Sequence, residues 1–160
     1  LLEVYPKWAN HETDQKALIV YDTMWGSTRE IANALANGLE DAGIPVTTRF
    51  LQTSHMSEIM TDVLVSRAVL VGSSTLNNGM LPTVSGFLTY VKGLRPKNRM
   101  GLAFGSYGWG GQGARHVEEA LKDMNWEIPH GLINIQYVPD DHELQGVKET
   151  GRKLGKIICE

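Results

Sequence analysis

Cysteine is almost missing from this chain: Cys159 is the only one among 160 residues. A single cysteine excludes an internal disulfide, a CxxC redox pair and a metal site built of several thiolates, and it favours a reducing, cytoplasmic location. No hydrophobic run approaches the roughly 20 residues that cross a bilayer. The first residues also lack the basic and then apolar segments of a secretory signal. We therefore expect a protein without membrane association.

An excess of positive charge is missing as well. The chain has 15 Lys and Arg against 18 Asp and Glu, a formal net charge of −3, and the basic residues are scattered. Because nucleic-acid binding needs a basic face, this composition argues against a nucleic-acid partner. The histidines are dispersed too, so we expect no metal site; they are His11, His55, His116, His130 and His142.

Short apolar segments alternate with helical patterns along most of the chain. Strands are predicted over residues 17–21, 46–51, 68–72, 100–104 and 132–138. Such alternation favours an α/β fold, here a three-layer, doubly wound, five-stranded parallel sheet with strand order 2-1-3-4-5. In a sheet of this order, ligands bind beyond the carboxyl ends of strands 1, 3 and 4.

Residues 1–16 fall outside this pattern. They are apolar in part up to Trp8, and then polar from Asn10 to Lys16. We interpret this segment as a linker or the remnant of a preceding domain, with residues 17–160 as the main domain. The alternative is an N-terminal arm that packs on that domain.

The first of three unusual loops joins the first predicted strand to a helix. It consists of Thr23, Met24, Trp25, Gly26, Ser27 and Thr28. The first backbone N–H groups of a helix have no partner within it, and the helix dipole favours an anion there, so this loop predicts a phosphate site. The P-loop lysine is absent, which argues against an NTPase. The alternative is an ordinary turn whose hydroxyl groups cap the helix.

Two further loops follow the third and fourth predicted strands. Residues 73–82 supply small polar groups, and the Asn78–Gly79 pair readily adopts positive φ. Residues 105–113 supply Tyr107 and Trp109, whose rings suit a flat heterocycle; the alternative is that they only cap the core. Because all three loops are expected at one crevice, the economical interpretation is a planar, phosphorylated cofactor.

Two other ligand-binding patterns fit less well. The glycines of residues 108–113 match GxGxxG, but this segment follows the fourth strand, and no acidic residue ends the next strand. A phosphoacceptor receiver domain shares the expected topology, and Asp22 suits its acidic cluster. However, Ser73 and Ser74 stand where such a domain has its aspartate, and Pro139 stands where it has its lysine. We reject both interpretations.

Four strings together resemble a known family: YDTMWGST, VGSSTLNNGMLPTV, GLRPKN and GLAFGSYGWGG. Residues 17–160 resemble the flavodoxin family, and the loops resemble those of the FMN domain of flavodiiron proteins. The resemblance implies that FMN is the cofactor and that the loop of residues 23–28 holds its phosphate. It also implies that the isoalloxazine ring is enclosed by Ser74, Thr75, Leu76, Asn77, Asn78, Gly79, Ser106, Tyr107, Gly108, Trp109, Gly110 and Gly111.

The same resemblance implies partners. In flavodiiron proteins, the flavodoxin-like domain follows a metallo-β-lactamase-like domain whose diiron site reduces O2 or NO. That domain, in the same polypeptide or a partner subunit, is the expected electron acceptor. Rubredoxin or a flavin reductase is the expected donor, and the full-length protein is expected to be a homodimer.

The main hypothesis is therefore an electron-transfer domain without catalytic side chains. The alternatives are a stand-alone FMN-dependent NAD(P)H:quinone reductase and a flavin-free interaction domain. The sequence offers no evident nicotinamide site, which argues against the reductase.

Overall fold

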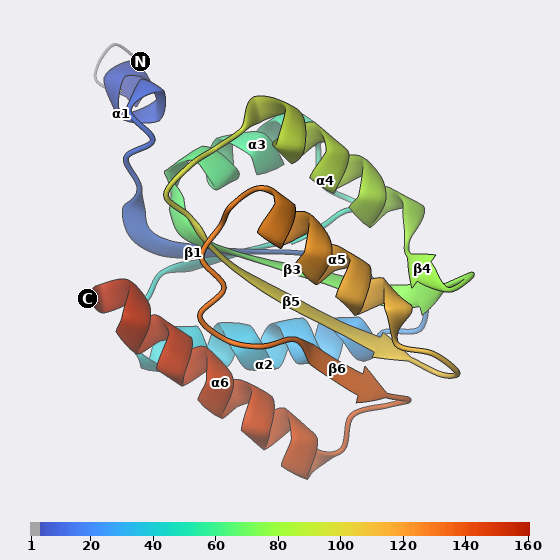
Figure 1. The fold of residues 1–160 in the computed structure, drawn as a ribbon. Coiled ribbons are helices and arrows are strands. Elements are labelled where there is room, and N and C mark those ends of the chain that lie inside the picture. Colours follow the sequence, from blue (N-terminus) through green and yellow to red (C-terminus); the bar gives the residue numbers. More distant parts are fainter. Residues whose placement is uncertain (1–3) are drawn as a thin grey trace.

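The computed structural model describes residues 4–160 of the chain (Figure 1). Its helices and strands are, in chain order, α1 (Val4–Ala9), β1 (Asp14–Asp22), α2 (Ser27–Asp41), β2 (Val46–Phe50), α3 (Met56–Val65), β3 (Ser66–Leu76), β4 (Gly79–Met80), α4 (Pro82–Leu94), β5 (Met100–Tyr107), α5 (Gln112–Asp123), β6 (Ile133–Gln136) and α6 (Asp141–Cys159). None of the helices in this described part is long and apolar enough to cross a membrane.

The sheet has the predicted parallel order. Its strands lie in the order β2-β1-β3-β5-β6, which is the expected 2-1-3-4-5 once the short β4 is set aside. The pairs Tyr21–Gly72, Gly72–Phe104 and Phe104–Ile133 lie in register across β1, β3, β5 and β6. The carboxyl ends of these four strands therefore lie side by side at one edge.

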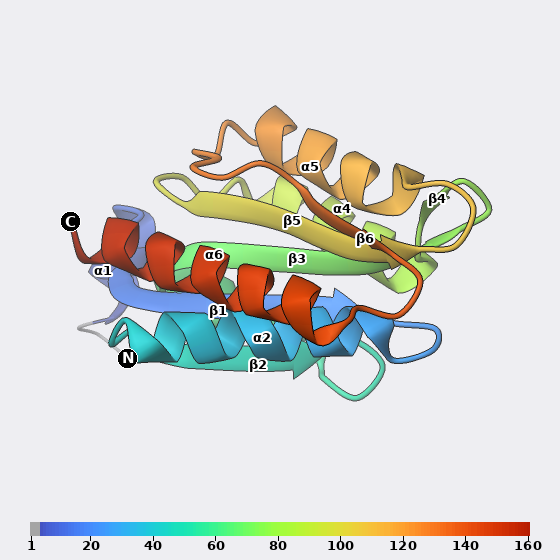
Figure 2. The same cartoon turned by 90° about the horizontal axis from the view of Figure 1, so that it is seen from below.

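Helices cover both faces of the sheet and make three layers (Figures 1 and 2). Alternate residues of β1 point to opposite faces: Ile19 and Tyr21 pack in the core beneath α2 and α6, whereas Leu18 and Val20 pack beneath α3, α4 and α5. Because both faces are buried, β1 has the continuous apolar run that is typical of a parallel strand. The fold class predicted from the sequence is confirmed.

The helices α2 and α6 pack backbone to backbone. A Cβ atom added to Gly151 of α6 would lie 2.6 Å from the carbonyl oxygen of Leu35 and 3.3 Å from Cα of Gly38, both in α2. Side chains would hold the two helices farther apart, so glycine is required at this contact. The contact fixes the axis of α2, the helix whose N-terminus forms part of the site.

The structure adds two short elements that the sequence-based expectation lacked. Residues 4–9 form the helix α1, and β1 begins at Asp14, which pairs with Ser66 before a register shift. Both lie in the segment interpreted as a linker, of which residues 1–3 are outside the described part. The second added element is β4, whose two residues pair antiparallel with the end of β3. The domain boundary itself stays a prediction.

Candidate cofactor site

The loop between β1 and α2 leaves backbone N–H groups free at the start of a helix. Its Gly26 has φ 93°, and no side chain caps α2. The hydroxyl oxygen of Thr23 accepts the Gly26 N–H at 3.0 Å, which closes the turn. Within the described residues, no acceptor is seen for the N–H groups of Trp25, Ser27 and Thr28. These donors and the helix dipole suit an anion such as a phosphate.

Three buried hydroxyl groups join the three predicted loops. The Thr28 hydroxyl lies 2.9 Å from that of Ser74 and 2.8 Å from that of Ser106. The N–H of Met24 also donates to the Ser74 hydroxyl, at 3.4 Å. We call Thr28, Ser74 and Ser106 the hydroxyl cluster. Thr28 lies in the first turn of α2, just after β1, whereas Ser74 and Ser106 lie near the ends of β3 and β5. The hydroxyl cluster therefore forms at the crevice expected from the strand order.

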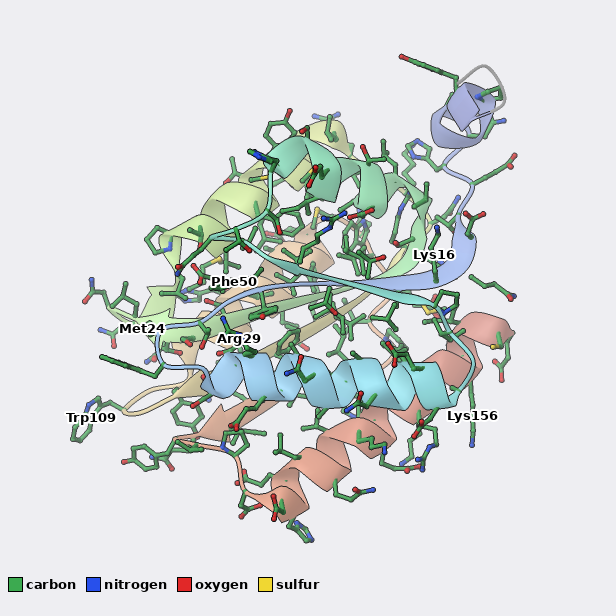
Figure 3. The ribbon with its side chains drawn as sticks, turned by 180° about the vertical axis from the view of Figure 1, so that it is seen from behind. Lys16, Met24, Arg29, Phe50, Trp109 and Lys156 are labelled. Atoms are coloured by element: carbon green, nitrogen blue, oxygen red, sulfur yellow. The ribbon has the colours of Figure 1, made fainter. Side chains whose placement is uncertain are left out.

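A cavity of about 510 Å³ opens above the hydroxyl cluster. Its lining residues are Met24, Trp25, Ser27, Ser74, Thr75, Ser106, Tyr107, Gly108, Trp109, Tyr137 and Val138. The indole rings are not part of the core, since Trp25 is 90% and Trp109 is 100% exposed. Figure 3 shows Met24 and Trp109 projecting at the same end of the molecule. Large exposed apolar groups around a cavity mark a binding site rather than a structural cap.

Two lining residues, Tyr137 and Val138, were not predicted from the sequence. They follow β6, which ends at Gln136 and not at residue 138 as expected. Tyr137 has φ 61°, and its N–H donates to the carbonyl oxygen of Tyr107 at 2.7 Å. One feature of the sequence could have identified Tyr137: it is an aromatic residue at the end of the last predicted strand. Because β6 pairs in parallel with β5, it ends at the same edge of the sheet as the other site loops.

The predicted residues Leu76, Asn77, Asn78 and Gly79 do not line the cavity. They form the hairpin between β3 and β4, in which Leu76 pairs with Gly79. Positive φ occurs at Asn77 (50°) and Asn78 (62°), and Gly79 is not among the residues with positive φ. The expectation of positive φ at the Asn78–Gly79 pair is thus wrong for Gly79, because a two-residue hairpin needs that conformation at its two central residues.

Gly110 and Gly111 are also not among the residues that line the cavity. Side chains of β6 hold this loop: Asn134 Nδ2 donates to the Gly111 carbonyl at 3.0 Å, and Gln136 Nε2 donates to the Gly108 carbonyl at 3.1 Å. The two glycines therefore belong to the loop that carries Trp109, and their contact with a cofactor stays a prediction.

No Lys or Arg in the described part of the chain lines the cavity. Arg29 directly follows the loop of residues 23–28 in sequence, but its side chain is engaged elsewhere. Its Nε donates to the Tyr21 hydroxyl at 3.1 Å, and its guanidinium lies 4.9 Å from the centre of the Phe50 ring. Figure 3 shows Arg29 next to Phe50, on the side of α2 that faces β2. An anion here would be held by amide groups, hydroxyl groups and the helix dipole.

A second cavity, of about 520 Å³, lies at the amino-terminal edge of the sheet beside Lys92, Arg95 and Lys97. The C-terminal ends of α4 and α5 border it, and helix C-termini disfavour anions. No aromatic ring is among its lining residues. It therefore suits a flat phosphorylated ligand less well than the cavity at the carboxyl edge.

The site fits FMN: free amides at α2 for the phosphate, and exposed aromatic rings for the isoalloxazine. A comparison with protein-family models decides the assignment, because the model described as "Flavodoxin" matches residues 19–151. The chain belongs to the flavodoxin family. FMN is the cofactor of this family, as expected from the sequence.

Longer proteins contain a region similar to this chain. The nitric oxide reductase of Moorella thermoacetica is 44% identical over 161 residues, which cover 100% of this chain and 40% of that protein. The solved rubredoxin oxygen:oxidoreductase of Desulfovibrio gigas has a TM-score of 0.95 and 35% identity, covering 99% of this chain and 39% of that one. The flavodiiron protein of Giardia intestinalis has a TM-score of 0.93 and 27% identity, covering 99% and 40%.

These comparisons confirm the resemblance to the flavodoxin-like domain of flavodiiron proteins. They also show that the chain spans about 40% of the length of the curated relatives it matches. The relatives therefore contain a further part that this chain does not match.

Proposed function

We propose that this flavodoxin domain is the FMN-binding electron-transfer domain of a flavodiiron protein. The observation that carries the proposal is the meeting of free helix amides, the hydroxyl cluster and exposed indole rings in one cavity. Partial coverage of the flavodiiron relatives supports the assignment to a larger redox protein.

The chain's own groups bind and orient the cofactor. The N–H groups of Trp25, Ser27 and Thr28, together with the dipole of α2, would hold the phosphate. The rings of Trp25, Trp109 and Tyr107, which line the cavity, would border a bound isoalloxazine and exclude water from it, each aromatic contact contributing about 0.5–1.5 kcal/mol beyond area burial. When bound, FMN supplies one- and two-electron chemistry, and the protein supplies binding, orientation and electrostatics.

The acceptor of the electrons lies outside this domain. Among residues 4–160, no three His, Cys, Asp or Glu side chains are grouped so that they could hold a metal ion. We place the diiron centre in a metallo-β-lactamase-like domain, within the part of the relatives that this chain does not match. Reduction of O2 or NO takes place at that centre.

The donor is a rubredoxin or a flavin reductase. Support comes from the name of the D. gigas relative, a rubredoxin oxygen:oxidoreductase. The longer protein works as a homodimer in the cytoplasm.

Four measurements test the proposal. The purified chain is expected to take up one FMN, to be reduced in a reductive titration, and to pass its electrons rapidly to a flavodiiron partner that lacks flavin. Steady-state oxidation of NADH with a quinone should be nearly absent. Rapid NADH-dependent turnover would instead identify a quinone reductase, and a colourless chain that takes up no FMN would identify an interaction domain.

A further inference from the structure

Asp22 is a buried carboxylate that has no role in the proposed binding of FMN as described above. It is the last residue of β1 and is 3% exposed. Its Oδ1 accepts the Thr23 N–H at 2.7 Å and a Gln52 side-chain N–H at 2.8 Å, and its Oδ2 accepts the Thr83 hydroxyl. No Lys, Arg or His within the described residues forms a salt bridge with it. Burying a carboxylate without a cation costs free energy, so its three hydrogen bonds need an explanation.

These hydrogen bonds lead directly into the phosphate loop. Asp22 fixes the N–H of Thr23, and the Thr23 hydroxyl in turn accepts the N–H of Gly26. Gly26 is left-handed and immediately precedes α2. Two successive hydrogen bonds therefore determine the path of the loop that leaves the amides of α2 free. The other two donors anchor Asp22 to separate segments, since Gln52 follows β2 and Thr83 lies in α4.

Asp22 itself does not line the cavity. Any effect on a ligand must pass through the loop, so its role is positioning rather than contact. Its position next to the phosphate loop also makes it a like charge for a bound phosphate. The carboxylate thus favours phosphate binding through the shape of the loop and disfavours it through its negative charge.

We propose that Asp22 is a positioning residue that shapes the loop of residues 23–26 for the phosphate group of FMN. This inference rests on the proposed FMN site. It predicts that the effect of Asp22 is confined to the phosphate end of the ligand. Riboflavin, which has the same ring system without the phosphate, is therefore the discriminating probe.

The experiment compares Kd for FMN and for riboflavin by flavin-fluorescence quenching, in variants of the whole chain. Asp22→Ala is expected to raise Kd for FMN by about 10-fold to 100-fold, as for lost hydrogen bonds to a charged group. Its Kd for riboflavin should change by less than about threefold. The proposal would be overturned if the ratio of the two Kd values, riboflavin to FMN, stayed within twofold of the wild-type ratio. The same holds if the affinities for both ligands fell equally.

Asp22→Asn separates geometry from charge. Its amide oxygen can still accept the N–H groups of Thr23 and Gln52, while its NH2 group donates to the Thr83 hydroxyl, which can accept. FMN should therefore bind this variant at least as tightly as wild type, because the shape is kept and the like charge is removed. An Asn variant as weak as the Ala variant would contradict the positioning role.

A matched control and a second variant complete the design. Asp62→Ala removes a carboxylate that accepts from Arg49 at 2.7 Å on α3, and it should leave the riboflavin-to-FMN ratio unchanged. If Asp22→Ala does not fold, Thr83→Val carries the test, with an FMN-specific rise in Kd of about threefold to tenfold. An unchanged ratio in that variant overturns the inference. Failure of the wild-type chain to bind FMN would instead refute the proposed function.

Discussion

Replacing Thr28 by valine removes the hydroxyl group that joins the three loops of the site while keeping the shape of the side chain. Thr28 is fully buried, and its hydroxyl lies 2.9 Å from that of Ser74 and 2.8 Å from that of Ser106. Each lost hydrogen bond costs about 0.5–1.5 kcal/mol, and a hydroxyl left without a partner costs more. The serine hydroxyls are 3.5 Å apart, so they can pair with each other after the change. We therefore expect the free energy of unfolding to fall by about 1–2 kcal/mol.

Urea denaturation of the FMN-free chain measures this loss, and thermal unfolding should show a decrease in Tm of about 2–8 °C. Kd for FMN should rise about twofold to tenfold, because the loops are no longer held at one point. Thr89→Val is the control: this exposed hydroxyl donates only to the Ser85 carbonyl of its own helix. A Thr28→Val chain with wild-type stability and wild-type FMN affinity would refute the coupling of the loops through the hydroxyl cluster.

Three further predictions concern the helix contact, the exposed indole and a surface carboxylate. Gly151→Ala should lower the free energy of unfolding by about 1–3 kcal/mol, because its Cβ would lie 2.6 Å from a carbonyl oxygen of α2. Gly146→Ala on the same helix meets no atom within 4 Å and should be neutral or stabilising in the same urea titration. Trp109→Ala should leave unfolding unchanged but raise Kd for FMN about twofold to tenfold, since the ring is 100% exposed; an unchanged Kd would exclude its contact with the ring system. Hydrogen bonding from Arg152 lowers the pKa of Asp41 below its ordinary value of 3.8. The stability that this carboxylate contributes is therefore fully present above pH 3.8 and is lost as the pH falls through the lowered pKa. A side-chain NMR titration in which the pKa of Asp41 is not lowered would contradict this prediction.

The fold class and the approximate positions of the strands could be predicted because they depend on local patterns. The apolar runs of β1, β3 and β5 are buried on both faces, and this requirement is visible in the sequence itself. The loop of residues 23–28 could also be found, since a strand, a glycine and a helix follow one another there. These features need no knowledge of which segments meet in space.

The remaining parts of the site depend on tertiary placement. Tyr137 lines the cavity only because β6 pairs with β5, and a four-residue strand gives a weak pattern from which to locate its end. The two residues of β4 are too few to show a period of two, so the hairpin at Asn77 and Asn78 could not be located from the sequence. Contact of these residues with the cofactor stays a prediction. From the sequence, Asp22 suggested only the acidic cluster of a receiver domain; its present role could not be seen because its partners Gln52 and Thr83 are distant in sequence.

The hydroxyl cluster draws its members from α2, β3 and β5, so an unfolded chain offers FMN no comparable partner. Ligand that binds only the native state adds about 2.7 kcal/mol to stability when its free concentration is 100 times Kd. Flavin supply in the cell would thus regulate how much of this protein escapes proteolysis, and a shortage of riboflavin would reduce its abundance as well as its redox capacity.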